Sequence, residues 1–188
     1  MSKRYSRQGL WSLFLICAVP LHVWTFILAF RDFSWVAART DTWDSIGVLS
    51  YGLIYALLES LVVFLVMALL GFLVSNYWNE DRRIALLSAL VLVIALWAIA
   101  GQIYFLAEVA PPSALVDFLA GLAHPVRVMY AVLMLLVAPT VLIPTYLVLK
   151  SERALRFVRE LTNRLGLLMM VYLLMDALAL IVILFRNI

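Results

Sequence analysis

Five long apolar stretches constrain the fold of this chain more than any other feature of its sequence. A helix that crosses the hydrocarbon core of a bilayer needs about 20 mostly apolar residues. The stretches that reach this length are residues 10–30, 47–75, 84–107, 127–149 and 165–185. No alternating strand-length segments of the kind that a membrane barrel needs are present. We therefore expect an all-α integral membrane bundle of five transmembrane helices, with residues 1–188 forming a single domain.

Composition and charge exclude most soluble functions. Hydrophobic residues make up 66% of the chain and charged residues 13%, against about 45–50% and about 25% in soluble domains. The net charge of +3 is what an excess of Lys and Arg in cytoplasmic loops produces. The sequence has no Gly-rich phosphate loop and no zinc-type spacing of Cys and His. We expect the lipid bilayer as a partner, and no nucleic acid, metal or cofactor.

The first apolar stretch follows a basic N-terminus, as the apolar region of a signal peptide does. It runs from Leu10 to Phe30, whereas the apolar region of a signal peptide has about 7–15 residues. No cleavage site of small residues ends it. We interpret this stretch as an uncleaved first span.

The basic residues fall unevenly on the two sides of the predicted spans. With the N-terminus inside, the inner segments hold ten of them: Lys3, Arg4, Arg7, Arg82, Arg83, Lys150, Arg153, Arg156, Arg159 and Arg164. The outer segments hold four: Arg31, Arg39, Arg127 and Arg186. Because cytoplasmic loops carry the excess of Lys and Arg, we expect a cytoplasmic N-terminus and an external C-terminus. The expected location is the inner (plasma) membrane of a cell, as a multi-pass protein.

Two connections between the spans have helical patterns of their own. After Pro111 and Pro112, the segment 113–125 places apolar residues at helical spacing, with Ser113 as a cap and Pro125 as a stop. The segment 150–164 is basic and amphipathic, with an apolar side formed by Leu155, Val158 and Leu161. We expect short interfacial helices here, the second on the anionic inner leaflet or, alternatively, docked to a cytoplasmic partner.

Four of the five predicted spans contain a titratable or helix-breaking residue, which is unfavourable in the middle of a bilayer. Glu59 lies near the middle of the second span, Asp176 near the middle of the fifth, and His22 near the centre of the first. The fourth span contains Pro139 and Pro144. An ionised side chain at the bilayer centre costs about 2.5–3.5 kcal/mol on insertion scales, and no Lys or Arg lies inside a span. Each acid must therefore be protonated, share a cation or be reached by water.

Tyrosines extend this polar layer along two spans. Tyr55 lies four residues before Glu59, and Tyr172 lies four residues before Asp176, so each pair shares one face of its helix. If the two faces meet, Glu59 and Asp176 form an ion- or proton-binding pair, with His22 as a relay and the tyrosines as flanking donors. Midplane acids among broken helices are typical of carrier binding sites. The leading hypothesis is proton- or cation-linked transport. We expect a homo-oligomer, because the five spans of one chain are few to enclose a transport pathway.

Other functions remain open at this point. A protonated acid can simply hydrogen-bond a neighbouring helix, a contact worth about 1–2 kcal/mol. The main functional alternative is a non-enzymatic accessory or assembly subunit of a larger membrane complex, in which the acids meet a partner's helices. An enzyme is disfavoured because no G-x-S-x-G or H-E-x-x-H is present, and no catalytic residue is assigned. Asp41 and Asp44 form a lone D-x-x-D that could hold a divalent ion, a spacing common by chance.

Overall fold

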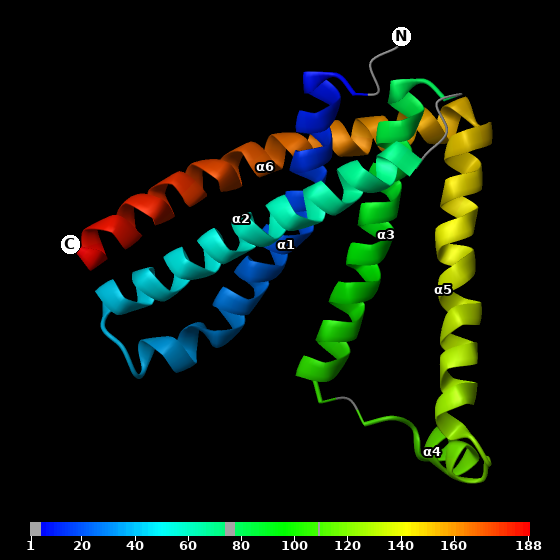
Figure 1. Cartoon of the computed structure of the whole chain (residues 1–188). Coiled ribbons are helices and arrows are strands. Elements are labelled where there is room, and N and C mark those ends of the chain that lie inside the picture. The colour runs from blue at the N-terminus through cyan, green and yellow to red at the C-terminus, as the bar shows by residue number, and fades with distance from the viewer. Residues whose placement is uncertain (1–4, 74–77, 109) are drawn as a thin grey trace.

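The computed structural model describes residues 5–73, 78–108 and 110–188, and the described residues form helices with no strand. The helices are α1 (Arg7–Ala37), α2 (Thr42–Leu73), α3 (Glu80–Leu106), α4 (Ser113–Ala120), α5 (Pro125–Lys150) and α6 (Glu152–Asn187) (Figure 1). All but α4 are long and apolar enough to cross a membrane. This confirms the five predicted helices and indicates a multi-pass membrane protein. Lys3, Arg4 and residues 74–75 of the second predicted span lie outside the described residues.

The helices extend beyond the apolar stretches that predicted them. α1 continues to Ala37 and α2 begins at Thr42, so the connection between them is a tight turn. The side chain of Asp41 accepts a hydrogen bond of 2.7 Å from the backbone N–H of Asp44 and caps the start of α2. Hydropathy identifies the apolar part of a helix, whereas the capping residue marks where the helix begins. The apolar stretches are therefore shorter than the helices.

The predicted basic helix and the fifth span are one continuous helix. α6 runs from Glu152 to Asn187, which at 1.5 Å per residue gives a length of about 54 Å, well beyond the ~30 Å hydrocarbon core. The chain turns instead at Ser151, whose side chain accepts from the N–H of Ala154. No Gly or Pro separates the basic part from the apolar part until Gly166, and that glycine is helical and faces Leu15 of α1.

The apolar side of the segment 150–164 is covered by protein. Leu155 is buried in a cluster with Ala85 and Ala89 of α3 and Val148 of α5, and Val158 packs against this cluster. The amphipathic pattern correctly identified an apolar side, but a pattern within one segment contains no information about what covers that side.

The short helix in the connection 113–125 is present as α4, and the expected roles of two residues differ. Ser113 is the first residue of α4 rather than its cap. The capping position is Pro112, which forms no side-chain hydrogen bond, and the helix ends at Ala120. Pro125 is the first residue of α5 rather than the stop of α4. Its fixed φ and missing N–H suit the first position of a helix.

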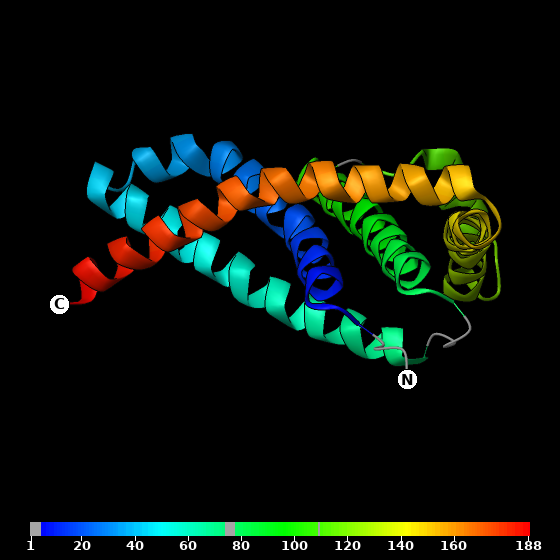
Figure 2. The same ribbon diagram turned by 90° about the horizontal axis from the view of Figure 1, so that it is seen from above.

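α1 is the central helix of the bundle. It contacts α2, α3 and α6. In Figure 2 the N-terminal half of α1 lies between α2 and α6, and α6 crosses α1 farther along. The core consists of side chains such as Leu13, Ile16 and Cys17 of α1, which pack with Met67 of α2 and Leu87 of α3. In Figure 1, α2 and α6 lean away from α3 and α5, so the helices splay apart.

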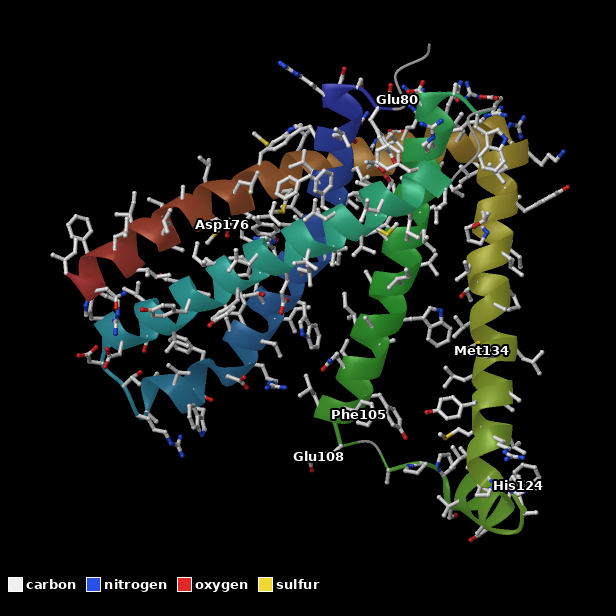
Figure 3. The ribbon with its side chains drawn as sticks, in the orientation of Figure 1. Glu80, Phe105, Glu108, His124, Met134 and Asp176 are labelled. Carbon is white, nitrogen blue, oxygen red and sulfur yellow. The ribbon has the colours of Figure 1, made fainter. Side chains whose placement is uncertain are left out.

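Polar contacts tie the helix ends near the N-terminus together through the first turn of α3. Glu80 accepts hydrogen bonds from the backbone N–H and the hydroxyl of Ser6, at 2.7 and 2.6 Å. Asp81 pairs with Arg159 of α6 at 3.0 Å, and Arg82 pairs with Glu152. Figure 3 shows Glu80 at this end of α3. The basic part of α6 is therefore held against α3.

Candidate functional site

His22 and Asp176 form a buried contact between α1 and α6. Nε2 of His22 lies 3.0 Å from Oδ2 and 3.2 Å from Oδ1 of Asp176. The two side chains are 0% and 3% exposed. Asp176 lies along α6 where this helix passes α1 and α2 (Figure 3). Two titratable side chains are thereby brought together inside a membrane helix bundle.

The other nitrogen of His22 sets the number of protons at this contact. Nδ1 lies 2.9 Å from the carbonyl oxygen of Ala18, and because that oxygen can only accept, Nδ1 carries a proton. A hydrogen bond between Nε2 and the carboxyl group then requires one further proton on one of the two groups. Either the imidazolium donates it to the carboxylate, or the carboxylic acid donates it to the neutral imidazole. In both forms the pair has no net charge, as burial away from water favours.

Aromatic rings cover the His22 side of this contact. The ring of Tyr172 stacks on His22 with a centroid distance of 5.9 Å and an angle of 10°. Phe26 of α1 stacks on Tyr172 in turn, at 5.2 Å. Tyr172 thus lies against the imidazole of His22, and its ring helps to exclude water from the pair.

Glu59 belongs to a different part of the molecule. It lines a cavity of about 1300 Å³ between α1, α2 and α3. Tyr55, one turn earlier on α2, lines the same cavity and is 66% exposed. Across from them, α1 contributes residues such as Trp24 and Thr25, and α3 contributes residues such as Gln102. Within the part of the chain that the structure describes, no side chain forms a hydrogen bond or ion pair with the Glu59 carboxyl group.

The predicted site residues therefore divide into two groups. The structure brings His22, Tyr172 and Asp176 together, and it places Tyr55 and Glu59 in the cavity, which Asp176 does not line. On α2 the buried residues Ala56 and Ser60 point into the bundle, and Glu59 lies beside them. Spacing by four correctly places two residues on one face of a helix, but it does not specify the neighbour of that face.

Gln102 and Trp24 are among the cavity residues that the sequence analysis did not assign to a site. Gln102 places a side-chain amide inside the third apolar stretch, which is a visible signal of a polar surface in a predicted span. Trp24 has no such signal, because a tryptophan in an apolar run is equally typical of a packed core. Its place on the lining follows from how α1 lies against α2 and α3.

The D-x-x-D pair has structural contacts. Asp41 caps α2, as described above, and Asp44 forms an ion pair of 2.7 Å with Arg186 at the end of α6. Arg186 also donates a hydrogen bond of 2.6 Å to the carbonyl oxygen of Trp43. The described residues contain no group of three or more His, Cys, Asp or Glu side chains that could hold a metal ion. These contacts join the end of α6 to the start of α2.

Comparison of the chain with protein-family models, with curated proteins and with solved structures finds no match.

Proposed function

We propose that this protein is a small proton- or cation-linked carrier of the cell inner (plasma) membrane, with Glu59 as the group that exchanges a proton for a cation. The observation that supports this most is the position of Glu59 on a large cavity between three membrane helices, where its carboxyl group has no hydrogen-bond or ion-pair partner among the residues that the structure describes. If Glu59 had a structural role, we would expect a buried partner for its carboxyl group, as His22 is for the carboxyl group of Asp176.

The cost of an ionised carboxylate supports an exchange at this position. Ionising Glu59 at the bilayer centre without a partner costs about 2.5–3.5 kcal/mol on insertion scales. A proton, a bound cation or water in the cavity removes this cost. A carboxyl group that alternates between a proton and a cation couples the movement of the two. Tyr55 lines the same cavity one turn away, where its hydroxyl can hydrogen-bond the carboxylate or its guest.

His22 and Asp176 have a positioning role in this proposal. Their contact is closed to water and joins α1 to α6, so it holds one wall of the bundle while the cavity residues bind. Tyr172 packs on the pair. These three residues form no part of the cavity lining.

The uneven basic residues support a cytoplasmic N-terminus and an external C-terminus. In this orientation the end of the bundle that carries Glu80 and the basic part of α6 faces the cytoplasm. The exposed Arg153 and Arg156 on that part of α6 then lie where anionic headgroups attract basic side chains. α4 lies at the external interface.

A second function, an accessory subunit of a larger membrane complex, is favoured by a different observation. Of the residues of α5, all of which the structure describes, only Val148 is fully buried. The apolar surface of α5 must therefore be covered by lipid, by a second copy of the chain or by the helices of a partner. In this second proposal Glu59 meets a hydrogen-bond donor on a partner's helix.

Flux across reconstituted vesicles tests the first proposal. Vesicles that contain the purified protein and an internal pH-sensitive dye receive Na⁺, K⁺ or tetraphenylphosphonium across a pH gradient. We expect at least one of these cations to dissipate the gradient, and Glu59→Gln to abolish the effect. Glu108→Gln is the matched control, because Glu108 follows the end of α3 and does not line the cavity (Figure 3).

Two outcomes of the flux experiment would contradict the carrier proposal. If no cation dissipates the gradient, or if Glu59→Gln behaves as the unsubstituted protein does, Glu59 is not an exchanging group. A stoichiometric partner chain in mild detergent together with absent flux would instead support the accessory subunit.

A further inference from the structure

We propose that the cavity beside Glu59 binds a hydrophobic monovalent organic cation, which replaces the proton of the Glu59 carboxyl group. This proposal rests on the assignment of Glu59 as the exchanging group and adds the class of the guest. On binding, the O–H bond of Glu59 breaks and its proton leaves to water, while the cation neutralises the carboxylate. No covalent bond to the guest forms.

The charges around the cavity specify one positive charge. Two carboxyl groups line it, those of Glu59 and Asp32. Asp32 already accepts hydrogen bonds of 2.7 and 2.9 Å from Arg31. The described residues that line the cavity include no Lys, Arg or His. One carboxylate thus lacks a counter-charge, and an anionic guest would add repulsion.

The other titratable residues on the lining do not change this charge count. They are Cys17 of α1 and Tyr55 of α2, besides Asp32, and α3 contributes none among its described lining residues. A thiol and a phenol are neutral near neutral pH. Neither side chain supplies a positive charge to balance the Glu59 carboxylate.

The apolar lining favours an organic cation over an inorganic one. Ca²⁺ takes about 6–8 oxygen ligands, and Mg²⁺ requires near-octahedral oxygen coordination. The lining as a whole consists mainly of aliphatic side chains, and the hydroxyl of Thr25 already donates to the carbonyl oxygen of Leu21. An organic cation needs no such set of ligands. It gains instead from burial of its own apolar surface, at about 25 cal/mol per Å².

Aromatic rings on the lining strengthen the choice. Trp24 and Phe33 of α1 and Tyr55 of α2 line the cavity. Trp35 also lines it, but the guanidinium group of Arg39 already lies over its ring, 4.4 Å from the ring centroid. The face of an aromatic ring attracts a cation, by about 0.5–2 kcal/mol, and sites for quaternary ammonium groups are built from such rings. The cavity volume of about 1300 Å³ also leaves room for a bulky guest, since drug-sized ligands fill about 300–1000 Å³.

Binding of tetraphenylphosphonium to the purified protein in detergent tests this inference. We expect one cation to bind per cavity and one proton to be released in weakly buffered solution. Glu59→Gln should weaken binding by about tenfold or more, the low end of what close charge pairs contribute, and should abolish proton release. Glu108→Gln should leave both unchanged. Trp24→Leu should weaken binding and keep proton release.

Two further measurements separate this inference from the proposed function. Triphenylphosphine oxide, an uncharged molecule of similar rings, should bind far more weakly, and equal binding would overturn the inference. Proton release by Na⁺ or K⁺ but not by tetraphenylphosphonium would also overturn it, while leaving Glu59 as an exchanging group. Proton release by no cation would overturn both. Unchanged elution of the variants from a sizing column shows that they are folded.

Discussion

A single shared proton determines the strength of the contact between His22 and Asp176. Because Nδ1 of His22 donates to the carbonyl oxygen of Ala18, Nε2 meets the carboxyl group either as donor or as acceptor, and each form needs its partner. Breaking a buried charged pair by removing one member leaves the other unsatisfied, which costs more than replacing both.

Two substitutions at this contact should therefore destabilise the protein to very different extents. Asp176→Asn retains an N–H donor opposite Nε2 of the Nδ1-protonated imidazole, so the free energy of unfolding should fall by about 1 kcal/mol or less. His22→Leu leaves the Asp176 carboxyl group, 3% exposed, without its partner, and should cost about 3–5 kcal/mol. Denaturant unfolding in detergent micelles measures both values.

The double variant His22→Leu/Asp176→Leu is the control. It removes both polar groups and should recover much of the stability that His22→Leu loses. Equal losses for Asp176→Asn and His22→Leu would contradict the assigned proton on Nδ1.

Glu59 and Asp176 show that two similar acids in two spans can have unrelated environments. Both lie near the middle of an apolar stretch, yet one is paired in the core and the other faces a cavity. The difference arises from the rotation of each helix about its own axis. That rotation depends on which residues pack, and a single polar residue does not fix it.

At the scale of the elements, the continuity of α6 has a direct consequence for the bundle. The part of α6 that contacts α3 through Leu155 and Arg159 is joined rigidly to the part that carries Asp176. A displacement at one end of a continuous helix is transmitted to the other. Two separate elements joined by a turn would not behave in this way.

Proline substitution tests whether α6 is continuous. Asn163→Pro removes a backbone hydrogen bond in the middle of the helix and clashes with the preceding turn, and should cost about 3 kcal/mol or more. Glu152→Pro is the matched control, because Glu152 is the first residue of α6 and Ser151 before it is already extended. It loses an exposed ion pair with Arg82.

The measurement is again denaturant unfolding in micelles. Similar small losses for the two proline variants would show that the chain turns near residue 163, as two separate helices would require.

In the assembled bundle, the splayed helices leave two surfaces with few protein neighbours. One is the lining of the cavity between α1, α2 and α3, and the other is α5, which packs mainly against α3 and α6. An apolar helix face with few protein neighbours is covered by lipid or by another chain. The sequence predicts a homo-oligomer, and we propose that a second copy of the chain covers α5 in it.

Cross-linking tests this arrangement. In a Cys17→Ala background, a cysteine at Leu135, which is 74% exposed on α5, should form covalent dimers of this chain with a short bis-maleimide reagent. A cysteine at the buried Val148 should not react. Mass measurement in mild detergent gives the number of copies, and a monomer without cross-links would contradict the homo-oligomer.

The sequence alone determined the features of this protein that depend on neighbouring residues. Solvent and backbone chemistry require each apolar stretch of spanning length to be helical, so the five long helices were predictable. The short helix after Pro112 was predictable for another reason, the helical spacing of its apolar residues. The helix borders were less so, because caps such as Asp41 lie outside the apolar stretches. The continuity of α6 followed from the absence of a breaker between residues 152 and 165, which the change from basic to apolar residues obscured.

Which polar groups meet depends on how the helices pack against one another. His22 and Asp176 are 154 residues apart in the chain, and their contact requires α1 to lie against α6 with one particular rotation of each helix. The same packing leaves Glu59 beside the buried stripe of α2, facing the cavity. A helical pattern gives the angle between residues of one helix, whereas packing of side chains from several helices sets the rotation of that helix against its neighbours. The composition of each span is therefore a local property, and the site is a property of the assembled bundle.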